Sequence, residues 1–338
     1  MKELVVAVVG VTGAVGSTML RVLEESRLSV GRVVALATAR SAGSTVVFRG
    51  QPIEVLDIVA YDFAGVDIAL FAGGEIASAD YVPAARRAGA VVIDNSSTYR
   101  MHADVPLVVP EVNPEHLRGH HGIIANPNCS TIQMVVALAP VLRRWGLKRV
   151  SVATYQSVSG TGKEAIAELK AQVQAWAAGE AIPEPKAYPH QIAFNLFPHI
   201  ASFDAEGFSG EERKMIDETH KILGCPSMPV MATCVRVPVF YAHSEAVQLQ
   251  TELPASPEQV RLELSQAAGI KVLDDPASGV YPTPLQAEHQ DLVLVGRIRR
   301  DLSCENGISM WVVGDNLRKG AASNAVQIAE KLVDMHLL

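Results

Sequence analysis

The sequence predicts an α/β protein in which a doubly wound parallel sheet is followed by a mixed α+β domain. Two observations support this prediction. Short apolar runs alternate with helical stretches over about the first 128 residues, as they do in a parallel sheet that is covered by helices. Later strands alternate apolar and polar side chains, which is typical of a sheet with one solvated or helix-covered face.

The parallel sheet begins with the apolar run 4–9, which leads into Gly10 and then into a helix over residues 17–25. Further buried strands are predicted at residues 33–37, 68–72 and 91–93, with a helix over 78–88 between the last two. In the second domain the clearest strands cover residues 148–158 and 246–253. The proline-containing stretch 182–198 has no clean period, so we expect a long excursion there.

The end of the chain is predicted to return to the first domain. From Arg318 onward, apolar residues recur at helical spacing as far as Val333, and we expect this helix to pack back on the parallel sheet. The predicted domains are therefore residues 1–128 with 318–338, and residues 129–317. A chain of 338 residues with 49% apolar side chains is also too long for one core of ordinary size.

Composition excludes several classes of protein. The longest apolar run, residues 134–142, is about half of a membrane span, and the run 4–9 is too short for a signal peptide, so we expect no integral membrane protein. A net charge of −7 without a long Lys/Arg run argues against nucleic acid as a partner. Four cysteines without a CxxC pattern predict neither a disulfide framework nor a metal site, and this usage fits a reducing cytoplasm.

A glycine-rich turn, Gly10-Val11-Thr12-Gly13-Ala14-Val15-Gly16, lies between the first predicted strand and the first helix. Such a turn aims backbone N–H groups and the helix dipole at a pyrophosphate. The spacing is GxxGxxG rather than GxGxxG, and a glycine-rich turn alone is often only a turn. Its place between a strand and a helix favours a Rossmann-like, nucleotide-binding domain.

The loop after the second strand bears on the choice of dinucleotide. The acidic residue that would hold a ribose 2′-hydroxyl is absent, and Arg40 and Ser41 stand there instead. These side chains suit a 2′-phosphate, which favours NADP over NAD. The alternative is a solvated arginine in a loop.

Cys129 precedes an apolar-periodic helix, so the sequence places its thiol at a helix N-terminus, where the dipole lowers a thiol pKa. A lone cysteine is usually a small buried hydrophobe, and we give that interpretation to Cys225, Cys234 and Cys304. A thiolate together with a nicotinamide suggests one chemistry in particular, in which sulfur adds to an aldehyde and a thioester follows hydride transfer. That chemistry needs a proton shuttle.

His243 and four charged residues are candidates for proton transfer and anion binding. His243 ends a loop between two predicted strands, a good position for acid/base chemistry, although most isolated histidines have no role. Arg236 is either a snorkelling surface residue or a carboxylate clamp. Glu211 and Lys214 share one face of a helix that a capping box opens, and the default interpretation is a solvated pair. Arg100 follows a polar loop at the carboxyl end of a strand, where open α/β sheets bind ligands.

Taken together, these segments resemble the aspartate-semialdehyde dehydrogenases over essentially the whole chain. The most specific element is Asn126-Pro127-Asn128-Cys129-Ser130-Thr131, which is similar to the nucleophile motif of the family. Next comes Arg236 with His243 seven positions later. The resemblance implies that Cys129 is the nucleophile, that His243 is the acid/base and that Gln156 orients the acyl intermediate.

The resemblance also assigns binding residues. It implies that Arg236 and Glu211 hold the α-carboxylate and α-amino group of the substrate, and that Arg100 and Lys214 hold phosphate. The implied NADP contacts are Gly10, Thr12, Gly13, Ala14, Val15, Gly16, Arg40, Ser41, Ser157, Ser159, Gly160 and Asn316.

The family reaction is the reversible, NADPH-dependent reductive dephosphorylation of L-4-aspartyl phosphate to L-aspartate 4-semialdehyde, on the path to diaminopimelate, lysine, methionine and threonine. The resemblance further implies a homodimer formed through the sheet of the central domain. One rival is an enzyme like N-acetyl-glutamyl-phosphate reductase, which would have no use for Glu211 opposite a free ammonium. The other is a catalytically silent, NADP-binding regulatory paralogue, against which the joint presence of Cys129, Gln156, Arg236 and His243 argues.

Overall fold

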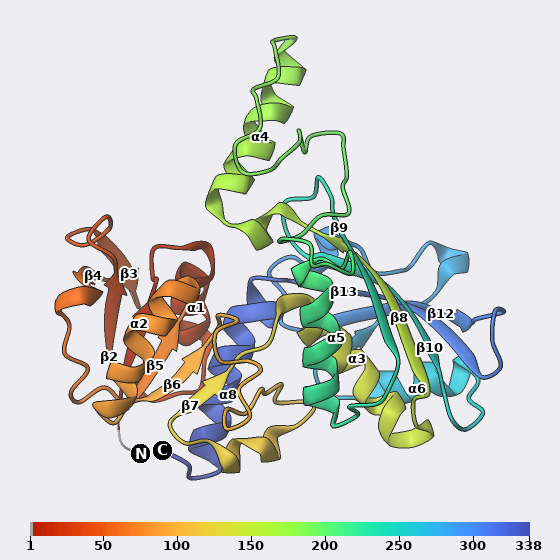
Figure 1. The fold of residues 1–338 in the computed structure, drawn as a ribbon, viewed down its shortest axis with the longest axis horizontal. Coiled ribbons are helices and arrows are strands. Elements are labelled where there is room, and N and C mark those ends of the chain that lie inside the picture. The colour runs from red at the N-terminus through yellow and green to blue at the C-terminus, as the bar shows by residue number, and fades with distance from the viewer. Residues whose placement is uncertain (1–2) are drawn as a thin grey trace. The chain divides into compact units, whose positions relative to one another are not determined.

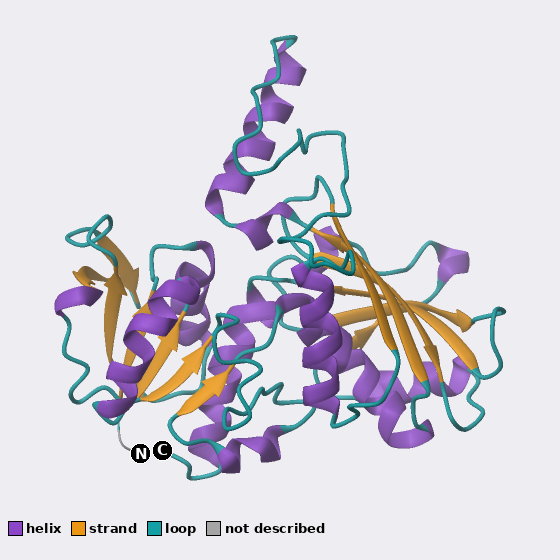
Figure 2. Cartoon of the chain, in the orientation of Figure 1, coloured by secondary structure: helices purple, strands orange, loops and turns teal. Residues whose placement is uncertain are grey.

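The computed structural model describes residues 3–338 and contains two compact units. The chain up to Asn128 together with Gly320–Leu338 forms the first unit, and Cys129–Lys319 forms the second. Each unit has its own sheet, drawn as orange arrows in Figure 2.

The sheet of the first unit has seven strands in the order β3 (Thr45–Phe48), β4 (Gln51–Asp57), β2 (Val30–Ala37), β1 (Leu4–Val9), β5 (Ile68–Phe71), β6 (Val91–Asp94) and β7 (Ile123–Ala125). Neighbouring strands pair in parallel, except for the antiparallel hairpin β3–β4. The sequence does not predict this hairpin, because its strands are mostly exposed and no buried apolar run marks them. The predicted doubly wound parallel sheet is confirmed.

Three helices cover this sheet. Helices α1 (Ala14–Glu25) and α8 (Ser323–Asp334) share one core with it, which contains Leu23 and Leu332 among other fully buried residues. Helix α2 (Gly74–Arg87) contacts β5 and β6 and lies in front of them in Figure 1. The last helix therefore packs on the first sheet as the sequence predicts. Helices α1 and α2 begin at Ala14 and Gly74, earlier than the apolar spacing indicates.

The sheet of the second unit has six strands in the order β11 (Ile270–Val272), β12 (Val293–Arg300), β13 (Gly307–Gly314), β10 (His243–Gln250), β8 (Arg149–Gln156) and β9 (Val230–Arg236). The pairs β8–β9 and β11–β12 are parallel, and the other three pairs are antiparallel. This mixed sheet with its helices confirms the predicted α+β domain. Strand β10 begins at His243, earlier than predicted, because three polar residues precede its apolar alternation.

Helices α3 (Cys129–Trp145), α5 (Gly210–Leu223) and α6 (Pro257–Gln266) pack on the second sheet, and α7 (Pro284–Ala287) is a short turn beside β13. Side chains of β8 alternate accordingly: Val150 and Val152 are buried, whereas Tyr155 is 37% exposed. Helix α4 (Lys163–Ala178) precedes a long stretch without helix or strand, residues 179–209, which contains the predicted excursion. No helix within residues 3–338 is long and apolar enough to cross a membrane.

Candidate active site

The glycine-rich turn joins β1 to α1 in the first unit. Gly10 has a φ of +77°, and a Cβ there would lie 2.7 Å from the backbone of Ala72. A Cβ on Gly16 would lie 2.1 Å from the carbonyl oxygen of Gly10, so both positions require glycine. Helix α1 begins after Gly13 with neither a side-chain cap nor an acidic residue in its first turn. This uncapped helix start, held close to the sheet, suits a pyrophosphate.

The loop after β2 lies beside this turn. Thr12 Oγ1 donates a hydrogen bond of 3.2 Å to Ser41 Oγ, which joins the two loops. Arg40, one residue earlier, is exposed to solvent. The structure thus brings the predicted pyrophosphate-binding and 2′-phosphate-binding residues to one edge of the first unit.

Cys129 is the first residue of α3, and its side chain is half-buried. The four cysteines, all within the described part of the chain, form no disulfide. Cys234 is fully buried, and burial raises the pKa of its thiol, so the structural interpretation holds for this residue. For Cys225 and Cys304 the prediction of a buried hydrophobe is wrong, because both are half-buried.

His243 is the first residue of β10, and its side chain is completely buried. Its Nδ1 accepts a hydrogen bond of 3.1 Å from the backbone N–H of Ser157. Because Nδ1 is an acceptor, the proton of the neutral ring belongs on Nε2, which has no hydrogen-bond partner among residues 3–338. Burial, and then the positive charge of Arg236, lower the pKa of His243 well below 6.5. The ring is therefore a neutral imidazole with Nε2–H uncommitted.

Ser157, Ser159 and Asn316 form one hydrogen-bonded cluster beside His243. Asn316 Oδ1 accepts hydrogen bonds from Ser157 Oγ at 3.1 Å, from Ser159 Oγ at 3.0 Å and from the backbone N–H of Ala242 at 3.1 Å. The amide oxygen is fully engaged, so the amide nitrogen of Asn316 is the side of the group that can meet a ligand. Three residues that the resemblance assigns to the cofactor are thus neighbours in the second unit.

Arg236 ends β9 and is only 4% exposed. Its Nη1 donates a hydrogen bond of 2.5 Å to the carbonyl oxygen of Ser157, and its Nε has no hydrogen-bond partner within residues 3–338. The alternative of a snorkelling surface arginine is therefore wrong. A Cβ on Gly160 would lie 3.2 Å from His243 Nε2 and 3.3 Å from Arg236 Nη1, so this glycine leaves open the space beside both groups.

Glu211 lies in the first turn of α5 and is 5% exposed. Its Oε1 accepts a hydrogen bond of 3.1 Å from Gln156 Nε2, and Gln156 itself is buried at the end of β8. The default interpretation of a solvated Glu211–Lys214 pair is wrong for the glutamate. Gln156, which binds this carboxylate, pairs with Arg236 in the β8–β9 ladder. A buried carboxylate and a buried guanidinium linked in this way suit a substrate that carries both a cation and an anion.

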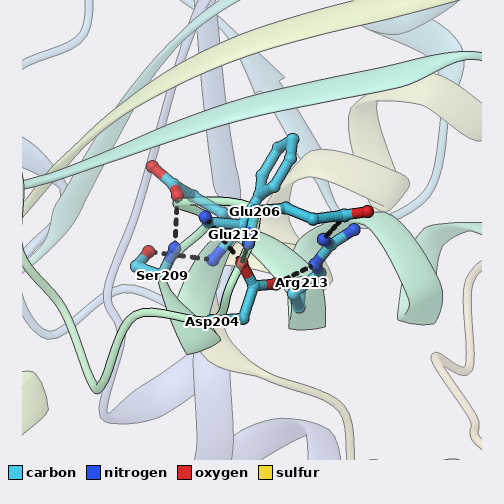
Figure 3. A network of polar contacts seen from close by, with 6 residues as sticks. Asp204, Glu206, Ser209, Glu212 and Arg213 are labelled. Carbon is cyan, nitrogen blue, oxygen red and sulfur yellow. Dashed lines mark hydrogen bonds and ion pairs between the residues drawn. The ribbon is translucent and has the colours of Figure 1, made fainter.

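The start of α5 is fixed by the polar contacts shown in Figure 3. Ser209 Oγ accepts a hydrogen bond from the N–H of Glu212, and the Glu212 carboxylate accepts one of 2.7 Å from the N–H of Ser209. This is the capping box that the sequence predicts. Arg213 adds ion pairs with Asp204, at 2.6 Å, and Glu206. These contacts anchor the turn of α5 that presents Glu211 to Gln156.

The two residues predicted to hold phosphate lie in different units. Lys214 Nζ is 3.8 Å from Glu211 Oε2, and the lysine side chain is 33% exposed. Arg100, in the first unit, is 7% exposed and donates from Nε to the carbonyl oxygen of Asn126 at 3.0 Å and from Nη2 to that of Asn95 at 2.8 Å. Backbone carbonyls therefore fix the plane of the Arg100 guanidinium.

Two buried polar residues of the second unit are missing from the sequence prediction. Gln133, in α3, is 1% exposed, and its Nε2 donates a hydrogen bond of 3.2 Å to the carbonyl oxygen of His243. Glu245, in β10, is completely buried, and neither of its carboxylate oxygens has a hydrogen-bond partner within residues 3–338. The signals were present: Gln133 is one helical turn after Cys129, and Glu245 shares the inward alternation of Val247.

The free energy of unfolding of Glu245→Gln, compared with that of the parent protein, should rise with increasing pH. Burial raises the pKa of this carboxyl well above 4.5, and the nearby amide of Gln133 opposes the shift only in part. Above pH 4.5 the folded state holds a proton that the unfolded chain releases, so the free energy of unfolding falls with rising pH. In this window the advantage of Glu245→Gln should grow by about 1.4 kcal/mol per pH unit until the folded-state pKa is passed. Urea unfolding between pH 5 and pH 8 measures it, and a difference that does not change with pH contradicts the prediction.

Two domain families match the chain. Residues 5–120 match the family described as semialdehyde dehydrogenase, NAD binding domain, and residues 138–319 match that described as semialdehyde dehydrogenase, dimerisation domain. Fold, site and both matches define the class as the nicotinamide-dependent semialdehyde dehydrogenases.

Comparison with individual proteins narrows this class. The chain is 52% identical to an aspartate-semialdehyde dehydrogenase of Aquifex aeolicus, over 98% of this chain and 99% of the relative, and 50% identical to that of Legionella pneumophila, over 100% and 98%. A crystal structure of aspartate semialdehyde dehydrogenase II from Vibrio cholerae, complexed with ASA, superimposes with a TM-score of 0.96 at 48% identity and covers 99% of both chains. The chain belongs to the aspartate-semialdehyde dehydrogenase family, which confirms the resemblance seen in the sequence.

Proposed function

We propose that the protein catalyses the reversible, NADPH-dependent reductive dephosphorylation of L-4-aspartyl phosphate to L-aspartate 4-semialdehyde. The observation that carries this proposal is the buried group formed by His243, Arg236, Gln156 and Glu211 in the second unit, the unit whose first helix begins with Cys129. The group offers a neutral proton donor, a cationic donor for a carboxylate and a carboxylate for an ammonium. The relatives named above carry this activity in their names.

In the proposed reaction, the Cys129 thiolate attacks the acyl carbon of aspartyl phosphate. A C–S bond forms, the C–O bond to the phosphoryl group breaks, and phosphate leaves with the electron pair, which yields a thioester. His243 Nε2 donates its proton to the substrate oxygen that becomes negative in the tetrahedral species, and it takes the proton back as the carbonyl re-forms. The Ser157 N–H holds Nδ1 as an acceptor, so one nitrogen performs both transfers.

Two buried charges orient the substrate. Arg236 has an Nε without a partner among residues 3–338 and holds the α-carboxylate, while Glu211 holds the α-ammonium. Gln156 donates to Glu211 and so fixes the carboxylate beside the end of β8. An enzyme for an N-acetylated substrate would face a neutral amide here, and the buried carboxylate of Glu211 would then have no ammonium group to bind.

The nicotinamide cofactor fits the residues present. Gly10 and Gly16 let the turn and helix α1 lie close against the backbone of the sheet, and the start of α1 is uncapped, so Gly10, Thr12, Gly13, Ala14, Val15 and Gly16 hold the pyrophosphate. In the second unit, Ser157, Ser159, Gly160 and Asn316 hold the nicotinamide half. NADPH, when bound, would supply hydride to the thioester carbon. Cleavage of the C–S bond would then release the semialdehyde and return Cys129 as the thiolate, with His243 Nε2 moving the proton of the substrate oxygen as in the first step. Arg40 and Ser41 select the 2′-phosphate, so NADP is the proposed cofactor.

Arg40→Ala should weaken NADP binding by roughly ten- to a hundredfold and leave NAD binding nearly unchanged. The reason is the loss of a charge-assisted hydrogen bond to the 2′-phosphate, worth about 1.5–3 kcal/mol. Calorimetric titration of both cofactors measures the effect. Arg32→Ala is the matched control, because it removes another exposed arginine, near the start of β2, whereas Arg40 lies in the loop after the end of this strand. Equal kcat/KM for NADP and NAD in the parent protein would contradict the choice of cofactor.

We also propose a homodimer that forms through the open face of the second sheet. Tyr155 is 37% and Met231 46% exposed on neighbouring strands, and the Tyr155 ring lies 5.4 Å from that of the half-buried Trp311. Such a strip of large apolar side chains on a sheet is typical of an interface. Light scattering measures the mass; a monomer at micromolar concentration would contradict the proposal.

One assay tests the proposed function. With NADP, phosphate and aspartate semialdehyde, the protein should produce NADPH, and it should turn over N-acetyl-glutamate semialdehyde far more slowly. Preference for the acetylated substrate would identify the rival reductase. Cofactor binding without turnover of either semialdehyde would identify a silent paralogue.

A further inference from the structure

Gln133 occupies an unusual place for a polar side chain. It is buried in α3 among Ile132, Met134 and Val135, all of them fully buried. It follows Cys129 by four residues, so both side chains lie on the same face of the helix. Its Nε2 donates to the carbonyl oxygen of His243, which opens β10. One buried hydrogen bond therefore connects the helix that begins with the thiol to the strand that begins with the imidazole.

Gly314 makes room for this contact. It lies directly opposite His243 in the β10–β13 ladder. A Cβ on Gly314 would approach Gln133 Oε1 to 2.8 Å and Gln133 Cβ to 3.2 Å. Gln133 Oε1 has no hydrogen-bond partner within residues 3–338. The amide is therefore held by packing over Gly314, by its hydrogen bond to the His243 backbone and by the nearby carboxyl of Glu245.

The imidazole of His243 is held independently at its other end. Ser157 contributes its N–H to Nδ1, and its hydroxyl lies 3.0 Å from the same nitrogen. Ser157 therefore sets the rotation and tautomer of the ring, whereas Gln133 holds the backbone from which the ring projects. The position of Nε2 depends on both supports.

We propose that Gln133 is a positioning residue, whose amide keeps the start of α3, with the Cys129 thiol, in register with the start of β10, with His243 Nε2. The inference rests on the proposed roles of Cys129 and His243. The Gln133 amide donates a hydrogen bond to the backbone carbonyl of His243, and it donates to no group to which we assign binding of substrate or cofactor. Loss of the amide should therefore affect the reaction step and leave binding of substrate and NADP nearly unchanged.

The test is Gln133→Met, which keeps the length of the side chain and removes the donor. We expect kcat to fall by roughly ten- to a hundredfold, because small misplacements of reacting groups have effects of this size. The KM for aspartate semialdehyde and the Kd of NADP should stay within about threefold, as expected for lost transition-state alignment. Gln172→Met is the matched control: Gln172 is fully buried and accepts hydrogen bonds from the N–H groups of Ile192 and Ala193, and none of these three residues has an assigned role in the reaction. It should lower the Tm without changing kcat.

A second variant separates positioning from general destabilisation. Gly314→Ala pushes the end of the Gln133 side chain away without changing a polar group, since the first atom that its Cβ meets is Gln133 Oε1. It should lower kcat with KM unchanged. In the double variant Gln133→Met, Gly314→Ala, kcat should be no lower than in the less active of the two single variants, because both substitutions act through the same amide.

Three results would overturn the inference: kcat of Gln133→Met within about threefold of the parent, an equal loss of kcat in Gln172→Met, or losses that multiply in the double variant. Should Gln133→Met not fold, an unchanged kcat of Gly314→Ala overturns it. These outcomes leave the proposed function standing as long as Cys129→Ser is inactive. An active Cys129→Ser would refute the proposed function itself.

Discussion

Cys129→Ser is expected to lower kcat by at least about a thousandfold while the Kd of NADP changes by less than about threefold. Cys129 opens α3, where the helix dipole favours an anion, and a serine hydroxyl forms far less of its reactive anion than a thiol does. The proposed cofactor contacts do not include this side chain, so binding should persist. Steady-state kinetics and calorimetry measure the two quantities.

Cys304→Ser is the control for this experiment, since Cys304 is also half-buried and has no assigned role. It should retain full activity. An electrophilic substrate analogue should label Cys129 in the parent protein. Labelling mainly at another cysteine, together with an active Cys129→Ser, would refute the assignment of the nucleophile.

Arg236→Lys is expected to slow both directions of the reaction by about thirtyfold or more, which corresponds to about 2 kcal/mol. The guanidinium has one donor on the Ser157 carbonyl and an Nε with no partner within residues 3–338. A lysine keeps the charge but cannot serve the Ser157 carbonyl and a carboxylate in the same planar geometry. Because the α-carboxylate is present in both acyl phosphate and semialdehyde, neither direction should be spared.

Lys214→Ala provides the contrast. It should raise the KM for phosphate in the assay that starts from aspartate semialdehyde, and it should leave the NADPH burst seen without phosphate nearly intact, because acylation of Cys129 does not use phosphate. If Lys214→Ala abolished the burst while the KM for phosphate stayed unchanged, Lys214 would be a substrate or structural residue. The division between carboxylate and phosphate sites would then be wrong.

Much of the fold is predictable from the sequence because its strongest signals are local. Strands β1, β5 and β6 are almost completely buried, so each appears as a continuous apolar run. Hairpin β3–β4 lacks such a run and is missed. The start of β10 is missed for the opposite reason: His243 and Glu245 are buried at positions where burial normally selects apolar side chains.

The environment of the site residues could not be predicted in the same way. Arg236 and Glu211 look like surface residues because their partners are distant in sequence. The carbonyl oxygen of Ser157 accepts a hydrogen bond from Arg236, and the side chain of Gln156 donates one to Glu211. Only the pairing of β8 with β9 brings Gln156 beside Arg236. The resemblance to a family provides their roles, whereas local physical chemistry provides the helix start at Cys129 and the turn at Gly10.

The most direct test of the proposed mechanism is mass spectrometry of the intact protein after rapid mixing with NADP and aspartate semialdehyde in the absence of phosphate, with NADPH measured in parallel. The mechanism predicts one aspartyl group per chain, located on Cys129 by peptide mapping, with one NADPH for each acylated chain and loss of the group when phosphate is added. NADPH formation without a covalent adduct, or an adduct on any residue other than Cys129, would contradict it.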